Sequence, residues 1–368
     1  MAAGARRWAM TWAETRVASK LGVTYPIIQG PLGGFASQRL TASVSTYGGL
    51  GSFGAHGLAP QAIGETIAEL RSLTSAPFAI NLWVSMEDGG ASSSDAAAFE
   101  RSLAPLVPHL RALGAPLPAF TPYTPQSFEQ QARAAIEARA PVLSFVFGAP
   151  PPELLTECRR RQIVTLGTAT TPEEAIELER AGIDVIVATG FESGGHRGSF
   201  LRSPEDSLIG TFSLVPQVVD SVSVPVVAAG GVADARGVVA ALALGAEGVQ
   251  LGTAFLACEE SGASSLQRQM LLRDAAQTAL TRGFTGRLGR GVRNQVLETL
   301  SVDGTPRLPY PLQRYLVRSL AAPAEAQARS ELVPMWAGQS ALLLRHTNAR
   351  ELLDSLVSGV TRLTSEHQ

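Results

Sequence analysis

The chain has 368 residues, 45% of them hydrophobic, and a formal net charge of −2 at pH 7. A chain of this length can bury a large core, and its near-neutral charge gives no basic excess that would attract a polyanion. The composition therefore predicts a globular enzyme and excludes nucleic acid as a partner. No segment reaches the roughly 20 apolar residues needed to cross a bilayer, so no membrane partner is expected either.

Residues 1–20 are expected to form an irregular or short helical extension. They contain Lys20 and three arginines among alanines and two tryptophans, and Glu14 interrupts what would be the apolar core of a signal peptide. We therefore expect a soluble protein in the cytoplasm. Lys20 is the only lysine in the chain, which excludes a Schiff-base lysine at the centre of a barrel.

The two cysteines are expected to be buried and without chemical function. Cys158 and Cys258 have no CxxC partner and no histidine cluster nearby. Neither a disulfide framework nor a metal site is therefore predicted.

Eight short apolar segments predict strands, and most are followed by a helical pattern such as 60–73, 172–181 or 234–244. The strands are expected to begin near Pro26, Gly49, Phe78, Val142, Ile163, Val185, Val224 and Gly248. Alternating strands and helices indicate a parallel sheet. Because no GxGxxG follows the first strand and the phosphate-type glycines come late, we favour a (β/α)8 TIM barrel over an open doubly wound sheet.

Two departures from the regular spacing mark additions to this barrel. Residues 85–125 form a long insertion after the third strand, expected to cover the mouth of the barrel. After the eighth strand, residues 259–368 show helical patterns broken by glycine-rich and proline-rich segments. The sequence thus predicts an extension at 1–20, a barrel at 21–258 and a small helical C-terminal annex at 259–368 packed on the barrel.

The most informative segment is the glycine-rich stretch 190–198, which follows a buried-strand pattern and contains His196, one of five histidines. Gly194 and Gly195 permit backbone with positive φ, which can hold an imidazole at the end of a strand. We interpret His196 as a catalytic residue, and a turn with a solvated histidine is the alternative. Glu192 either orients His196 or is a solvated acid of the loop.

A second candidate site joins two strand ends late in the chain. Gly230 and Gly231 follow the seventh strand, just before a helix that starts at Asp234, and Gly252 and Thr253 follow the eighth. Backbone amides there, helped by the positive end of the helix, would bind a phosphate. Ordinary turn chemistry is the alternative. A cup made of backbone amides suits the phosphate of a large cofactor anchored by other contacts.

At these positions the chain resembles the nitronate monooxygenase family, FMN-dependent TIM-barrel enzymes formerly called 2-nitropropane dioxygenases. The resemblance runs from about Leu21 into the C-terminal region. The segments that carry it are 25–32, Asn81, 194–198, 229–231 and 250–253, with 284–287 and 335–339 further on. In place of the family's more usual Ala-Pro-Met, this chain has Gly30-Pro31-Leu32, which puts the shape of the substrate in question.

The resemblance implies that the chain oxidises nitronates or nitroalkanes with O2 to carbonyl compounds and nitrite. It implies that His196 is the catalytic base beside the flavin or, when protonated, an anchor for an anionic nitronate. The residues implied to surround the FMN phosphate are Gly195, Gly230, Gly231, Gly252 and Thr253. Those implied to line the isoalloxazine and ribityl chain are Gln29, Gly30, Asn81 and Gln250.

Three other functions stay open from the sequence. The first is a related FMN-dependent NAD(P)H reductase of enoyl thioesters or quinones, although quinone-reducing relatives tend to carry His-Pro-Gly where this chain has His196-Arg197-Gly198. The second is a non-redox barrel isomerase or lyase whose phosphorylated substrate occupies the glycine cup. The third is a catalytically silent binding protein. Association into a homo-oligomer is also left open.

Overall fold

The computed structural model describes residues 12–85, 88, 90–91, 93–123, 126–273 and 277–365. Within these residues, eight parallel strands form one sheet in the order β1-β9-β8-β6-β5-β4-β3-β2. They are β1 (Ile27–Gln29), β2 (Gly51–Gly54), β3 (Phe78–Trp83), β4 (Val142–Val146), β5 (Val164–Ala169), β6 (Val185–Thr189), β8 (Val226–Ala229) and β9 (Gly248–Leu251). Each begins within two residues of its predicted start.

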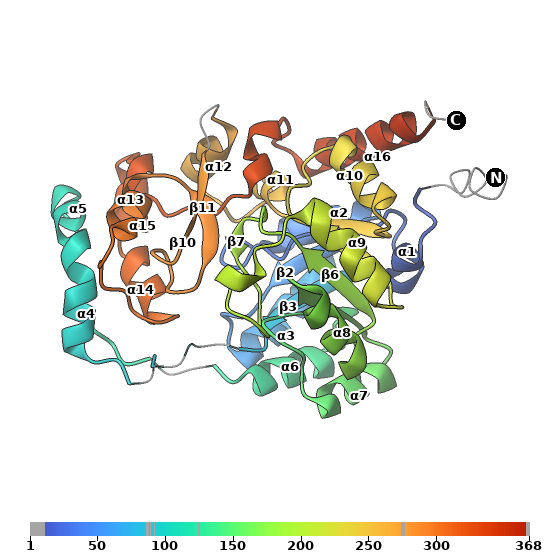
Figure 1. Cartoon of the computed structure of the whole chain (residues 1–368), viewed down its shortest axis with the longest axis horizontal. Coiled ribbons are helices and arrows are strands. Elements are labelled where there is room, and N and C mark those ends of the chain that lie inside the picture. Colours follow the sequence, from blue (N-terminus) through green and yellow to red (C-terminus); the bar gives the residue numbers. More distant parts are fainter. Residues whose placement is uncertain are drawn as a thin grey trace.

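The sheet closes on itself between its first and last strands. Ile28 of β1 pairs in parallel with Leu50, the residue before β2. The amide of Leu50 donates to the Ile27 carbonyl, and the amide of Gln29 donates to the Leu50 carbonyl, both at 2.9 Å. The predicted (β/α)8 barrel is therefore confirmed, with helices on its outer face (Figure 1).

The outer helices begin where local chemistry favours a helix start. The barrel helices are α2 (Gln38–Tyr47), α3 (Pro60–Leu73), α6 (Phe128–Glu137), α7 (Pro152–Arg160), α8 (Pro172–Ala181), α9 (Thr211–Ser221) and α10 (Ala235–Ala243). Proline occupies the first turn of α3, α7 and α8, where its missing N–H leaves no bond unmade. The side chain of Asp234 caps α10 by accepting from the amides of Arg236 and Gly237. The long C-terminal helix α16 (Ala349–Ser365) packs against α10 and α2.

The barrel interior is closed at its amino-terminal end by helix α1 (Arg16–Leu21). Val17 and Leu21 of α1 belong to the same buried cluster as Ile28, Val187 and other residues of the strands. Residues 1–11 of the predicted extension lie outside the described part of the chain. With one end filled by α1, the opposite end, where the strands finish, is left for a site.

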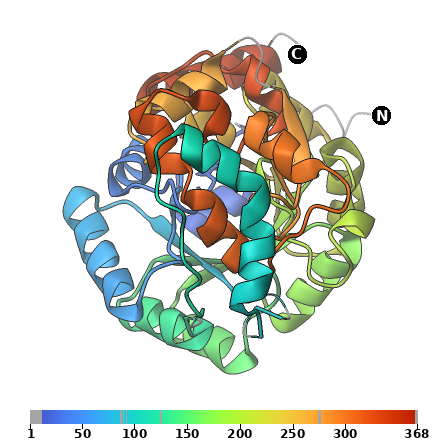
Figure 2. The same ribbon diagram turned by 90° about the vertical axis from the view of Figure 1, so that its left-hand side faces the viewer.

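The insertion after β3 folds into α4 (Ala96–Leu103), η1 (Ala104–Leu106) and α5 (Val107–Ala112). Figures 1 and 2 show these helices outermost at the end of the molecule that faces away from α1, with the C-terminal segments between them and the barrel. Nε2 of His109 lies 3.0 Å from the Thr299 hydroxyl, and Gln327 donates to the Leu113 carbonyl at 2.8 Å. The insertion therefore packs on the C-terminal annex.

The annex is not wholly helical, which differs from the prediction. Besides α12 (Ser265–Leu272), α13 (Gln295–Ser301), α14 (Leu312–Arg318) and α15 (Ala321–Ala326), it contributes two strands, β10 (Thr278–Thr281) and β11 (Gly289–Val292). These form a three-stranded antiparallel sheet with β7 (Gly195–His196). A Cβ atom on Gly289 would lie 2.8 Å from the Gly195 carbonyl oxygen. The glycines that make this segment a poor strand former are thus what let it approach β7.

No helix in the described ranges is both long and apolar enough to span a bilayer.

Candidate active site

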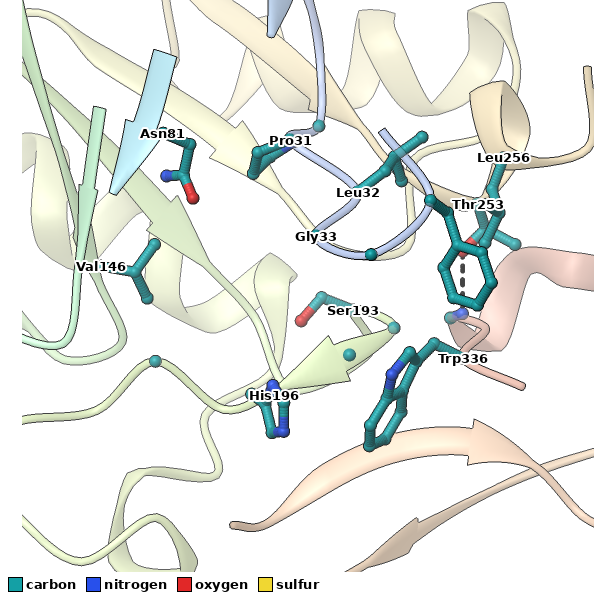
Figure 3. A pocket seen from close by; sticks show the side chains of 18 of the residues that line it. Pro31, Leu32, Gly33, Asn81, Val146, Ser193, His196, Thr253, Leu256 and Trp336 are labelled. Carbon is teal, nitrogen blue, oxygen red and sulfur yellow. Dashed lines mark hydrogen bonds between the residues drawn. The ribbon is translucent and has the colours of Figure 1, made fainter. Parts of the chain in front are cut away.

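A cavity of about 510 Å³ lies at the carboxyl ends of the barrel strands, between the barrel and the annex. Its wall brings together most of the predicted site residues, which are Gly30, Asn81, Gly195, His196, Gly230, Gly231, Gln250, Gly252 and Thr253. In Figure 3, Asn81, His196 and Thr253 surround one open space from different sides. This end of a parallel barrel is where TIM-barrel enzymes place their active sites.

His196 lies at a strand pair rather than in an unsupported loop. It pairs with Gly289 across β7 and β11, so the annex fixes its backbone. Its Nε2 atom lies 2.7 Å from Oγ1 of Thr285, also in the annex. The indole rings of Trp336 and Trp83 lie 5.0 and 5.2 Å from the imidazole, centroid to centroid.

The surroundings of His196 keep its imidazole neutral. Burial lowers the pKa of His196 well below its ordinary value, and the positive charges of Arg287 and Arg314 lower it further. A neutral imidazole has a lone pair that can accept a proton at neutral pH. These electrostatics favour a base over a protonated anchor.

The guanidinium of Arg287 packs on two aromatic rings that lie next to His196, those of Phe147 and Tyr310. Its guanidinium carbon lies 4.4 Å above the Phe147 ring and 4.5 Å above the Tyr310 ring. Its Nε donates to the Asp88 carboxylate at 2.7 Å, and its Nη1 donates to the Ser85 carbonyl at 3.0 Å. Arg287 is buried and is not part of the cavity wall.

Glu192 neither orients His196 nor is simply a solvated acid. The single Thr211 amide N–H donates to both oxygens of the Glu192 carboxylate, at 2.9 and 3.0 Å, and the Thr211 hydroxyl donates to Oε2 at 3.0 Å. Glu192 thereby caps the amino end of α9, where unpaired amides and the helix dipole favour a negative charge. Buried Arg197 donates to the Thr170 carbonyl at 3.0 Å and to the Thr189 carbonyl. Glu192 and Arg197 therefore fix the loop before and after His196 to neighbouring parts of the barrel.

The residues of the predicted glycine cup, Gly230, Gly231, Gly252 and Thr253, all line the cavity. Gly230 and Gly231 have φ of 95° and 78°, which L side chains rarely adopt. In the described residues, the amides of Gly231 and Gly252 donate no hydrogen bond to another protein group. At the start of α10, the amides of Arg236 and Gly237 already donate to the Asp234 carboxylate, so these two amides are not free to bind a phosphate.

Thr253 lines the cavity and also forms a hydrogen bond with the annex. Its hydroxyl accepts a hydrogen bond from the Gly338 amide at 2.9 Å, which Figure 3 draws as a dashed line. A Cβ atom on Gly338 would lie 2.9 Å from the Glu192 carbonyl oxygen and 3.1 Å from the Gly194 nitrogen. The predicted site segment around residues 335–339 therefore closes onto the cavity through close backbone contacts.

Two predicted amide side chains are placed differently. Asn81 lines the cavity, and its Nδ2 donates to the Ser144 hydroxyl at 2.8 Å, which fixes the orientation of the amide. Gln29 does not line the cavity. It is fully buried, donates to the Ser52 carbonyl at 2.9 Å and accepts from the Ser52 amide at 3.0 Å, so it joins β1 to β2.

Several residues of the site were not found from the sequence. His56 follows β2 and stacks on Trp83 with ring centroids 3.8 Å apart, and burial lowers its pKa to about 3. Trp336 and Arg314 enter the cavity from the annex. A histidine just beyond a predicted barrel strand was a usable signal for His56, whereas nothing local to Arg314 indicated the site.

The described residues contain no group of three or more His, Cys, Asp or Glu side chains that could hold a metal ion. Cys158 and Cys258 are both free and buried, and burial raises the pKa of the Cys158 thiol to about 11.

Comparison with known proteins gives consistent matches across the whole chain. The family model described as nitronate monooxygenase matches residues 14–359. Proteins described as probable nitronate monooxygenase from Staphylococcus haemolyticus and Staphylococcus aureus (strain Newman) are 40% and 39% identical over 355 residues. Each alignment covers 96% of this chain, and 98% and 99% of the relatives.

Solved structures agree with this result. The nitroalkane oxidase of Streptomyces ansochromogenes superposes with a TM-score of 0.86 at 32% identity, over 96% of this chain and 99% of that one. FabK of Thermotoga maritima superposes with a TM-score of 0.74 at 26% identity, over 96% and 98%.

The fold and the cavity define a (β/α)8-barrel oxidoreductase that acts on a small molecule. Within that class, the chain belongs to the nitronate monooxygenase family, a family of flavoenzymes.

Proposed function

We propose that this enzyme binds FMN and oxidises nitronates or nitroalkanes with O2 to carbonyl compounds and nitrite, with His196 as the base. The observation that carries the proposal is the juxtaposition of a neutral histidine and free backbone amides in one cavity at the strand ends. Family membership supports the reaction class.

The residues present fit an FMN molecule. The cup offers unpaired amides at Gly231 and Gly252 and has no side chain at Gly230, where a Cβ atom would lie 2.9 Å from the Gly190 carbonyl oxygen. Such a cradle of amides suits a phosphate. Gly30, Asn81 and Gln250 line the stretch of wall from which the ring and ribityl chain would be held. Bound FMN would supply the electron transfer and the oxygen chemistry.

His196 would remove the proton from the carbon that bears the nitro group. The C–H bond breaks, the proton moves to the imidazole, and the electron pair moves into the nitro group to give the nitronate. The Thr285 hydroxyl donates its one proton to the Arg287 carbonyl oxygen, 3.3 Å from Oγ1. The hydroxyl oxygen can then only accept from His196, so Nε2 carries the hydrogen and donates to Thr285. The lone pair of the neutral imidazole is left on Nδ1. We infer that Nδ1 is the basic atom.

The proposal is tested with the purified protein and its His196→Ala variant. Wild-type protein should show the visible absorption of FMN, lose it on anaerobic mixing with a nitronate, and form nitrite in air without added NADPH. His196→Ala should keep the flavin and lose most turnover of a neutral nitroalkane. Unchanged turnover would remove His196 as the base.

A second candidate is an NAD(P)H-dependent flavin reductase, which the likeness to FabK over nearly the whole chain favours. Flavin reduction by NADPH but not by a nitronate would select it. A colourless protein that binds a phosphorylated substrate would instead select the non-redox isomerase or lyase.

A further inference from the structure

Arg314 of α14 reaches across the cavity between the annex and the barrel. It lines the cavity from the annex side. A Cβ atom on Gly34, in the loop after β1, would lie 3.2 Å from its Nη2 atom. The guanidinium group is therefore placed at the cavity and against a barrel loop, while the residue stays partly exposed to solvent.

The charge of Arg314 has no acidic partner among the described residues. None of the ion pairs formed by the described residues contains Arg314. Glu325 also lines the cavity, but among the described residues it forms no ion pair with Arg314 or Arg318. Arg287, the other cation near His196, forms an ion pair with Asp88 at 2.7 Å and does not line the cavity. Among the described residues, Arg314 is thus a cavity-lining cation without an ion-pair partner.

A second arginine extends this positive charge outward. Arg318 follows Arg314 by one helical turn, lies on the same face of α14 and lines the same cavity. It is exposed to solvent. Two like charges four residues apart on a helix are unfavourable without an anion between or beside them. They also attract anions toward the opening.

These arginines are not part of the glycine cup. Figure 1 shows α14 beside β10, well apart from α10 and α11 (Thr253–Leu256), which follow the strands that carry the cup. Arg314 lies toward His196 instead. Tyr310, two residues before α14, packs against the imidazole with ring centroids 5.8 Å apart, and the charge of Arg314 is one of the causes that lower the pKa values of His196 and His56. The cation therefore lies at the end of the cavity that contains the proposed base.

We propose that Arg314 binds the negative charge of the nitronate, whether the nitronate enters as such or forms in the cavity when His196 deprotonates a nitroalkane. The inference rests on the proposed function and adds a residue to it. A nitronate presents two oxygens in one plane, as a carboxylate does, and a guanidinium donates to such a pair in a fork. The neutral His196 cannot supply that charge, and Arg287 is already paired. Arg318 would guide the anion in from solvent.

The test compares Arg314→Gln and Arg314→Lys with Arg293→Gln as the matched control. Arg293 is an exposed arginine of the same annex that does not line the cavity. The holoenzymes are titrated calorimetrically with sodium nitrate, a planar oxyanion that is not turned over. KM is measured for one nitronate, for the corresponding neutral nitroalkane and for NADPH. Unchanged visible absorption shows that the variants keep their flavin.

Arg314→Gln should raise the Kd of nitrate and the KM of the nitronate at least tenfold, while the KM of the neutral nitroalkane changes less than twofold. Arg314→Lys should fall between, and Arg293→Gln should match wild type. Equal effects on nitronate and nitroalkane, no nitrate binding by wild type, or an effect confined to NADPH would each overturn the inference. If wild type oxidises no nitro compound, the proposed function fails, and the nitrate titration still decides whether Arg314 binds an anion.

Discussion

Nε2 of His196 lies 2.7 Å from Oγ1 of Thr285, across the junction between the barrel and the annex. The imidazole follows β6 of the barrel, and the hydroxyl belongs to the annex segment between β10 and β11. The imidazole is therefore oriented by a residue almost ninety positions later in the chain. Correct docking of the annex is a condition for a correctly placed imidazole.

Without the Thr285 hydroxyl, the hydrogen of the neutral His196 imidazole should no longer be held on Nε2 and should be distributed between the two ring nitrogens. Thr285→Val keeps the shape of the side chain, so we expect a loss of about tenfold or more in kcat for a neutral nitroalkane with little change in KM. Thr285→Ser should restore most of the rate. Nitrogen NMR of histidine-labelled protein, assigned with His196→Ala, would show Nε2 protonated in wild type and a mixture in Thr285→Val. Identical spectra and rates in the Val and Ser variants would show that the hydroxyl has no such role.

The charge of Arg287 should set the acid limb of the pH profile. His196 must be neutral to act as a base, and the nearby positive charges of Arg287 and Arg314 lower its pKa together with burial. For a neutral nitroalkane, kcat/KM of wild type should therefore stay level as the pH falls through 6.5. Arg287→Gln removes one cation, so the limb should move to higher pH.

Arg287→Lys keeps the charge and serves as the control for that shift. The two variants differ in charge but both lose the fork to Asp88 and Ser85, so a structural effect would appear in both. An acid limb that moves equally in the Gln and Lys variants would assign Arg287 a packing role alone.

The cup should tolerate no side chain at Gly230. Its φ of 95° is strained for alanine, and the added Cβ would lie 2.9 Å from the Gly190 carbonyl oxygen. Gly245 has nearly the same φ, 96°, but lies outside the cavity, with Val219 3.0 Å from its Cβ position. Both alanine variants should lose roughly 1–3 kcal/mol of stability. Only Gly230→Ala should also lose flavin absorbance per mole of protein. Equal flavin retention in both would argue against a cofactor phosphate at Gly230.

The barrel was predictable because its strands are short apolar runs that alternate with well-capped helices. The segments at Phe78, Val142, Val185 and Gly248 begin where they were expected, since buried parallel strands read as continuous apolar sequence. Glycines at strand ends indicated where the cavity would lie. These signals are local, so one sequence is enough to show them.

What the sequence did not show depends on contacts between distant segments. β11 pairs with β7 because Gly289 lets two backbones meet, and glycine is a poor predictor of a strand. Glu192 looked like a partner for His196, yet the amino end of α9 lies closer to its carboxylate. Arg314 reaches the cavity from a helix of the annex. Its role follows only from how the annex docks.

His56 should make the folded protein less stable in acid. The His56 side chain is buried, with an exposed fraction of 3%, and stacks on Trp83. Burial, together with the positive charges of Arg314 and Arg287, lowers its pKa in the folded protein to about 3. An unfolded chain would protonate the same imidazole near pH ~6.5. Below that pH the unfolded state binds a proton that the folded state does not, so the free energy of unfolding falls as the pH falls.

The expected slope is large enough to measure. Between pH ~6 and ~4, His56 alone should remove about 1.4 kcal/mol of stability per pH unit, and His196 should add to the loss in the same direction because its pKa is also lowered. Urea denaturation of wild type and His56→Gln would separate the two. The variant should show a shallower pH dependence in this range and a slope equal to that of wild type above pH ~8. Parallel curves from pH 4 to pH 8 would mean that His56 is protonated in the folded protein, with Trp83 or a nearby group compensating its charge.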